Sequence, residues 1–292
     1  MVSSPGPEGN DEVSDSKSRS GRIHNVTLAN FLKSLKVNED PRQQELAIKI
    51  LGACPEIIQG YWSVAGISLE PRLSSRWITN MAYFGAIISL PIPTYCFSTV
   101  LSKGSLSTPS YNPSPPPLNT IVENVIPSIF TKVFVTKGLQ LNSEPLVRHC
   151  TSLALAKCLD KFESIRQAFT TVEAALEENE ETGQWMRRRL ELEKEVRRRV
   201  PDFQVVVALS QRNVSALAST SALAAATVVD QSQPGEATRN ELLSEASLRL
   251  MWLYHRSLPS LAAEARFDPG KLLLSMTRQG QQHHSSRIIC SC

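Results

Sequence analysis

The sequence lacks the compact motifs on which most enzyme classes depend. Its 292 residues contain no glycine-rich phosphate loop, no Gly-x-Ser-x-Gly elbow and no His-Glu-x-x-His helix, the patterns that hold phosphates, expose a nucleophile or bind zinc. A large excess of positive charge is absent too, because the formal net charge is only +3. Dedicated polybasic nucleic-acid binders carry far more. The sequence therefore predicts a protein that is not an enzyme, and any RNA contact must come from local patches of charge.

Uninterrupted apolar runs of the length that crosses a membrane, about 20 residues, are also missing. Residues 78–101 are interrupted by Pro91 and Pro93, and residues 205–229 contain Arg212, whose charge is unfavourable in lipid. Both stretches therefore predict buried helices. We expect neither a membrane partner nor a small-molecule substrate.

The N-terminus lacks the apolar core of a secretory signal, so we expect the six cysteines to lie in a reducing compartment without disulfides. His149 and Cys150 are adjacent on a predicted helix, where neighbouring side chains point about 100° apart and do not act as base and nucleophile on one face. Cys150 and Cys158 fall in an apolar stripe, so we expect both to be buried as small hydrophobic side chains.

Four side chains of zinc-binding type stand in the C-terminal tail, namely His283, His284, Cys290 and Cys292. A Cys-x-Cys pair with an adjacent His-His is not one of the usual spacings of structural zinc sites. We therefore expect no metal and no cofactor.

Residues 144–162 predict one amphipathic helix that begins at Pro145, because proline suits the first helical position. Gly138 and Asn142 predict the turn before it. Apolar side chains recur along this helix at spacings of three and four and form a wide stripe. The stripe consists of Leu146, Val147, Cys150, Thr151, Leu153, Ala154, Leu155, Cys158 and Phe162. So wide a stripe needs neighbouring helices, as in stacked helical repeats, which favours a scaffold over a catalyst.

Helices are expected along most of the chain. Residues 26–35 and 41–53 each have helical periodicity, with Asp40 as N-cap of the second, and Ser74 or Ser75 caps a further helix that ends where two prolines follow. The ranges 118–130, 201–229 and 241–255 predict the remaining helices of apolar character.

Strand signals are weak. Residues 133–135 and 204–207 are β-branched, but they lie among helical patterns and have no strand partner. An all-α fold, an α-solenoid of stacked helices, is therefore the prediction.

We expect three parts along the chain: a disordered tail over residues 1–22, a helical-repeat domain over residues 23–274 and an aperiodic tail over residues 275–292. Within the domain, residues 102–117 predict an exposed loop rich in proline and serine. Residues 163–200 predict a charged helical segment.

Two runs of three arginines provide candidate contacts for RNA or another acidic partner, because guanidinium groups bind phosphate bidentately and keep their charge. A second interpretation stays open. Glu193 precedes Arg197 by four residues, and Glu195 precedes Arg199 by four, so the runs also fit a salt-bridged solvent face. The candidate contacts are Arg187, Arg188, Arg189, Arg197, Arg198 and Arg199.

The four tryptophans offer stacking surfaces for bases, although none stands in an aromatic cluster of the kind that RNA-binding sheets present. Trp77 and Trp252 are expected to fill space between helices.

Five blocks stand in the order and approximate spacing of a known family: SRWITNMAYFGAIISLPIP (75–93), PPPLNTIVENVIPSIFTK (115–132), GLQLNSEPLVRHCTSLALAKCLDKF (138–162), EVRRRVPDFQVVVAL (195–209) and EASLRLMWLYHRSLPSLAAEARFDPGKLL (245–273). Together they resemble the nucleolar pre-ribosomal-associated protein 1 family, large helical scaffolds of early large-subunit precursors. No block is a catalytic signature. The resemblance covers most of residues 70–274, and residues 1–22 and 275–292 lie outside it.

The resemblance implies an armadillo- or HEAT-like fold, a nucleolar location within the nucleus, and a non-enzymatic scaffold in early large ribosomal subunit biogenesis and ribosomal RNA maturation. Implied partners are precursor ribosomal RNA, small nucleolar RNA particles and other assembly factors, including a DEAD-box RNA helicase. Family members are much longer, so the chain would correspond to a fragment. The alternative is a generic helical-repeat adaptor that binds protein without RNA: a contiguous basic stripe favours RNA, and a large exposed apolar groove favours a protein partner.

Overall fold

The computed structural model describes residues 25–93, 96–99, 110–179, 183–226, 234–265 and 270. These residues form helices and one pair of short strands. In chain order the elements are α1 (Val26–Ser34), α2 (Pro41–Ala53), the 3-10 helix η1 (Pro55–Ile57), α3 (Ile58–Tyr61), α4 (Ser75–Ile88), β1 (Ser98–Thr99), β2 (Ser110–Tyr111), α5 (Leu118–Val125), α6 (Lys132–Gln140), α7 (Pro145–Ala175), α8 (Gln184–Arg199), α9 (Phe203–Ala226), α10 (Pro234–Ser257) and α11 (Pro259–Glu264).

Local sequence signals explain where several helices begin. The Asp40 carboxylate caps α2 by accepting a hydrogen bond from the Arg42 N–H at 2.8 Å. The Ser74 hydroxyl caps α4 by accepting from the Trp77 N–H at 3.2 Å. Pro145 occupies the first turn of α7. These predicted starts are confirmed.

α7 extends beyond its predicted end. Ile165, Phe169 and Val172 are buried and continue the apolar stripe at spacings of three and four, which carries the helix to residue 175. The charged segment predicted over residues 163–200 is therefore divided between the C-terminal part of α7 and the whole of α8.

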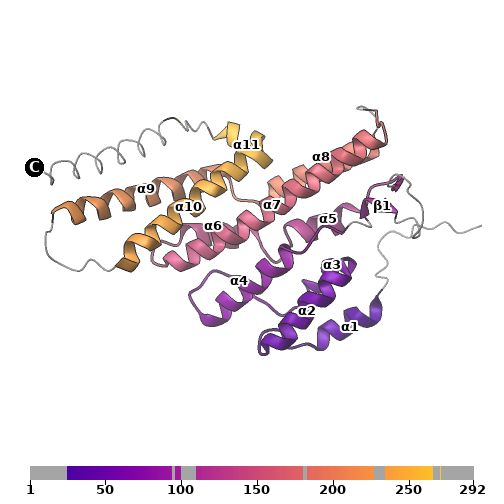
Figure 1. Cartoon of the computed structure of the whole chain (residues 1–292), viewed down its shortest axis with the longest axis horizontal. Helices are drawn as coiled ribbons and strands as arrows, with labels where there is room; N and C mark the ends of the chain where they lie inside the picture. The colour runs from indigo at the N-terminus through magenta and orange to yellow at the C-terminus, as the bar shows by residue number, and fades with distance from the viewer. Residues whose placement is uncertain are drawn as a thin grey trace, which may run out of the picture.

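α7 is the central element of the fold. α1–α4 lie on one side of it and α9–α11 on the other (Figure 1), and α4, α5, α6, α8 and α10 all pack against it. In a simple stack of repeats each unit contacts only its neighbours. The predominantly helical class is confirmed, whereas the helical-repeat architecture stays a prediction.

Large side chains fill the space around α7. Trp77, Phe84, Phe162, Trp185 and Tyr254 are among the largest fully buried residues, and they belong to one contiguous apolar cluster. Burying a side chain of this kind contributes about 1.5–3 kcal/mol. The wide apolar stripe of α7 thus has the neighbours that it requires.

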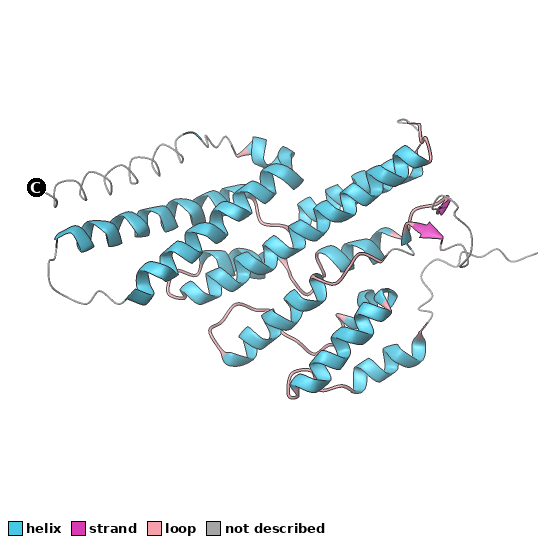
Figure 2. Cartoon of the chain, in the orientation of Figure 1, coloured by secondary structure: helices cyan, strands magenta, loops and turns pink. Residues whose placement is uncertain are grey.

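A small antiparallel pair of strands interrupts the helical pattern (Figure 2), with Ser98 opposite Tyr111 and Thr99 opposite Ser110. The exposed loop predicted over residues 102–117 is therefore wrong at positions 110 and 111, and its residues up to 109 lie outside the described part of the chain. Residues 133–135 and 204–207 are helical, as predicted.

Gly138 lies inside α6 rather than in the turn, which corrects its predicted role; Asn142 does lie in the turn. A Cβ atom at Gly138 would stand 2.5 Å from the Thr151 hydroxyl oxygen of α7. Glycine is required here because α6 and α7 approach closely.

The tails predicted over residues 1–22 and 275–292, with His283, His284, Cys290 and Cys292, fall outside the described residues. Within the described part of the chain, no helix has both the length and the apolar character needed to cross a membrane. There, too, no three or more His, Cys, Asp or Glu side chains gather as a metal site would require.

Candidate nucleic-acid interface

α8 carries all six candidate arginines and is amphipathic. Trp185, Leu192 and Val196 are fully buried and fix one face of the helix against the core. The arginines project from the other faces, where carboxylates of the same helix and of α5, α7 and α11 are within reach. Their partners decide which of them remain available to a phosphate.

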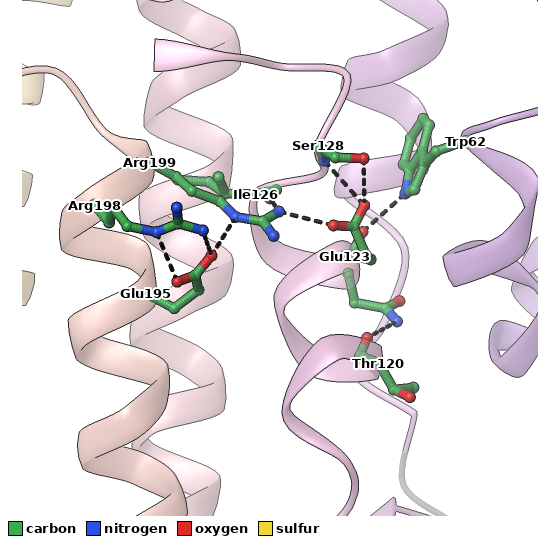
Figure 3. Close-up of polar contacts among 9 residues, drawn as sticks. Trp62, Thr120, Glu123, Ile126, Ser128, Glu195, Arg198 and Arg199 are labelled. Carbon is green, nitrogen blue, oxygen red and sulfur yellow. Dashed lines mark hydrogen bonds and ion pairs between the residues drawn. The ribbon is translucent and has the colours of Figure 1, made fainter. Parts of the chain in front are cut away.

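Arg199 is held in a buried network between α8 and α5 (Figure 3). Its guanidinium donates to the Glu123 carboxylate at 2.8 Å, to the Ile126 carbonyl at 2.7 Å and to Glu195 at 2.9 Å. The other carboxylate oxygen of Glu123 accepts from the backbone N–H and the hydroxyl of Ser128, and the Glu123 carbonyl accepts from the Trp62 indole N–H. The guanidinium of Arg199 is therefore occupied by contacts within the protein.

Two further arginines cross to other helices. Arg189 makes a bidentate ion pair with Glu173 of α7, at 2.7 and 3.1 Å. Arg197 pairs with Glu264 of α11. The predicted Glu195–Arg199 pair is confirmed, whereas the one expected between Glu193 and Arg197 is wrong, because α11 supplies a carboxylate to Arg197 instead.

Of the remaining three arginines, Arg187 and Arg198 are exposed and Arg188 is half-buried. Arg198 pairs with Glu195 at 2.6 Å, yet 73% of its side chain stays exposed. Hydrogen bonds from Arg198 first and then from Arg199 lower the pKa of Glu195, which keeps that carboxylate ionised. Arg188 lies 3.3 Å from Glu191. Arg187 is exposed and has no ion pair among the described residues.

The cysteines and the histidine of α7 do not form a nucleophilic site. Cys158 is fully buried and Cys150 is partly buried against the same core, so both pack as the sequence predicted. Burial raises the pKa of both thiols, which disfavours the reactive thiolate.

Trp252 corrects one prediction. Trp62, Trp77 and Trp185 are buried, but 54% of Trp252 is exposed on the outer face of α10. The Arg256 guanidinium lies 5.1 Å from the centre of its ring, within the range of a cation–π contact.

Two surface hollows lie away from the outward face of α8. One, of about 490 Å³, is polar and lies between α3 and α5, with Glu123 and Arg199 in its wall. The other, of about 440 Å³, lies beside the start of α7 and is bordered by Leu73, Leu146 and Leu242, which are 52%, 46% and 50% exposed. Three half-exposed leucines thus line one hollow.

Comparison with known proteins supports the family resemblance seen in the sequence. A family model described as "Ribosome 60S biogenesis N-terminal" (Npa1) matches residues 3–80. The chain resembles the nucleolar pre-ribosomal-associated protein 1 family. The match includes residues 3–22, so the expectation that the resemblance excludes the N-terminal tail is wrong.

Proteins named nucleolar pre-ribosomal-associated protein 1 are similar over most of the chain. The human protein is 26% identical over 294 residues and the mouse protein 25% over 295, each covering 92% of this chain. The Saccharomyces cerevisiae protein is 27% identical over 188 residues, or 64% of this chain. The chain spans only 9–12% of the length of these relatives. No solved structure matches it.

Proposed function

We propose that the chain takes part in biogenesis of the 60S ribosomal subunit, in the nucleolus, as part of a non-enzymatic scaffold that holds precursor ribosomal RNA and assembly factors together. The observation that carries this is the match to a 60S biogenesis family, with relatives whose names place them in the nucleolus and on pre-ribosomes. Holding partners near one another raises their effective concentration without chemistry.

The described residues support a role without chemistry. The buried thiols of α7 are disfavoured as thiolates, and the carboxylates around α8 are occupied by arginines. A catalytic site needs a nucleophile or base that is free to act on a substrate. The hollow bordered by the three leucines and the exposed Trp252 instead offer surfaces for assembly factors, among which we include a DEAD-box RNA helicase.

RNA contact by α8, as proposed from its arginines, is centred on Arg187 and Arg198. These two side chains are the more exposed, while Arg189, Arg197 and Arg199 are engaged with carboxylates of other helices. An arginine held by a carboxylate of another helix has fewer donors and less net charge to offer a phosphate, whereas Arg198 pairs only within α8 and stays 73% exposed.

An adaptor that binds protein without RNA is the second candidate. The specific observation in its favour is the hollow beside Leu73, Leu146 and Leu242, because an exposed apolar surface rimmed by polar groups is suited to an apolar side chain of a partner.

The two candidates are separated by tagging the chain in cells, crosslinking it, sequencing the attached RNA and identifying the co-purified proteins. We expect enrichment of large-subunit precursor RNA together with nucleolar assembly factors. Recovery of protein partners without precursor RNA would support the adaptor and contradict the RNA scaffold.

A matched pair of variants sharpens this experiment. Leu146→Ser with Leu242→Ser removes two leucines of the hollow, and Leu176→Ser with Leu190→Ser removes two exposed leucines elsewhere. We expect the first pair to lose protein partners while the second pair keeps them. Equal loss in both would show that the hollow has no special part in assembly.

A further inference from the structure

Arg148 of α7 is a cation with little compensation. One N–H of its guanidinium donates to the Asn213 side-chain oxygen at 3.4 Å, and its Nε is buried without a hydrogen-bond partner. Asn213 is itself 3% exposed and donates to the Leu243 carbonyl of α10 at 2.9 Å, which fixes the oxygen that Arg148 contacts. The position of the Arg148 guanidinium is thus defined by three helices, α7, α9 and α10.

Arg212 of α9 directly precedes Asn213, the residue that Arg148 contacts, and its charge acts on the Arg148 guanidinium. Its guanidinium donates to the Asn142 side-chain oxygen, to the Leu139 carbonyl at 3.4 Å and to the Ala208 carbonyl at 3.2 Å. These acceptors belong to the end of α6, to the turn between α6 and α7, and to α9 itself. They are all neutral.

Among the residues that the structure describes, the two guanidiniums therefore carry like charges and neither has an ion pair. Burial lowers the pKa of Arg148, and the neighbouring charge of Arg212 lowers it further. Arginine nevertheless stays protonated, so both positive charges persist. Among the described residues neither side chain has an ion pair with a carboxylate, in contrast to the arginines of α8.

The surroundings of the two guanidiniums are suited to binding an anion. Both arginines lie near the first turn of α7, a helix of 31 residues whose N-cap residue, Glu144, makes no side-chain capping bond. The N-terminus of a long helix carries a partial positive charge that adds to the field of the two guanidiniums; the Glu144 carboxylate opposes this field but has no ion pair with either arginine among the described residues. Both side chains remain partly exposed, so an anion in solution can reach them.

We propose that Arg148 and Arg212 together bind a phosphate group of an RNA backbone. The oxyanion would take up N–H donors that the neutral acceptors leave unused, and its charge would relieve the repulsion between the two guanidiniums. A planar guanidinium fits the tetrahedral oxygens of a phosphate bidentately. This inference rests on the proposed role beside precursor RNA, and it assigns part of the RNA contact to the α6–α7–α9 junction instead of to α8.

The test measures binding of a labelled single-stranded oligouridylate between about 50 and 200 mM salt. Each phosphate contact on a single strand contributes about 0.7 to the slope of log affinity against log salt. Arg148→Gln with Arg212→Gln should lower that slope by about 0.7, because the two arginines share one phosphate. The control, Arg42→Gln with Arg76→Gln, removes the same charge from exposed positions and should leave the slope nearly unchanged. An equal reduction in both double variants would overturn the proposal, because net charge alone would explain it.

A second measurement guards against loss of folding and separates the possible anions. Arg148→Lys with Arg212→Lys keeps both charges and should keep most of the slope, whereas a loss as large as that of the glutamine pair would mean that the arginines act structurally. Inorganic phosphate should raise the melting temperature of the wild-type chain and not that of the glutamine pair. If phosphate stabilises the wild type while oligouridylate binding ignores the pair, the site takes an anion that is not RNA, and the inference fails.

The proposed function is tested separately by recovery of precursor RNA in cells. Suppose that the Arg148→Gln, Arg212→Gln variant binds oligouridylate with the wild-type salt slope while the wild-type chain recovers precursor RNA in cells. This result would refute only the assignment to Arg148 and Arg212. The opposite result is that the glutamine variant lowers the salt slope in solution but the wild-type chain recovers no precursor RNA in cells. This result would refute the proposed function and support the anion site.

Discussion

The arginines of α8 and the Arg148–Arg212 pair differ in the counter-charges that the fold places beside them. α8 has the densest basic run of the chain, yet Arg189, Arg197 and Arg199 pair with carboxylates that three other helices supply. Arg148 and Arg212 are isolated arginines in their segments, and within the described part of the chain all the acceptors of their hydrogen bonds are neutral. The density of basic residues in a sequence therefore does not measure the positive charge that a folded surface has available for a phosphate.

The largest effect should come from breaking the buried pair of α8. Arg199→Met leaves the 5%-exposed Glu123 without its guanidinium partner, and an uncompensated buried carboxylate is unfavourable by about 3–5 kcal/mol. We expect a fall of that order in the free energy of unfolding, measured by urea denaturation. The control Arg187→Met removes an exposed arginine of the same helix and should change stability by less than about 0.5 kcal/mol.

A double-mutant cycle with Glu123→Gln tests the cause. If the two positions act through their ion pair, the double variant should be less destabilised than the sum of the single variants. Strict additivity would mean that Arg199 stabilises the protein by packing and through its bond to the Ile126 carbonyl.

Lys161 extends the comparison to a buried cation that has no ion pair in the part of the chain that the structure describes. It is 7% exposed, its ammonium has no hydrogen-bond partner among the described residues, and burial lowers its pKa to about 8. The unfolded chain, with a lysine pKa near about 10.4, binds more protons between the two values. Stability should therefore rise as the pH increases from about 8 to about 10.4.

Below that window the ammonium is charged in both states and the cost of burying it is at its greatest. Lys161→Met should stabilise the protein at neutral pH by roughly 2–3 kcal/mol and remove the rise at high pH, as measured by urea denaturation across the pH range. Lys157→Met is the matched control, because Lys157 is exposed and donates to the Gly85 carbonyl of α4. An unchanged pH profile in the Lys161 variant would contradict the assignment.

Sequence patterns predicted what depends on neighbouring residues along the chain. The cap at Asp40, the first turn at Pro145 and the Glu195–Arg199 pair all lie within four residues of their partners, and the structure confirms them. The stripe of α7 predicted a helix that needs neighbours on several sides. These signals are local, so one sequence suffices to recognise them.

Features that depend on distant segments were not predictable in this way. Arg197 pairs with a carboxylate 67 residues later, and Arg199 with one 76 residues earlier. Gly138 was assigned to a turn, although its small size serves the approach of α6 to α7. In the sequence, the charge of Arg212 indicated only that residues 205–229 do not cross a membrane. Its position near Arg148 depends on the contact between α9 and α7 in the folded chain and could not be predicted from the sequence.

The smallest expected effect concerns the accessible arginines of α8. Arg187→Gln and Arg198→Gln should each change the free energy of unfolding by less than about 0.5 kcal/mol, because both side chains are exposed. If α8 also contacts RNA, each should lower the salt slope of oligouridylate binding by about 0.7. A slope that stays at the wild-type value in both variants, but falls in the Arg148–Arg212 variant, would remove α8 from the interface. The contrast between the two regions would then be complete: the basic run would serve the fold, and the uncompensated pair would serve the partner.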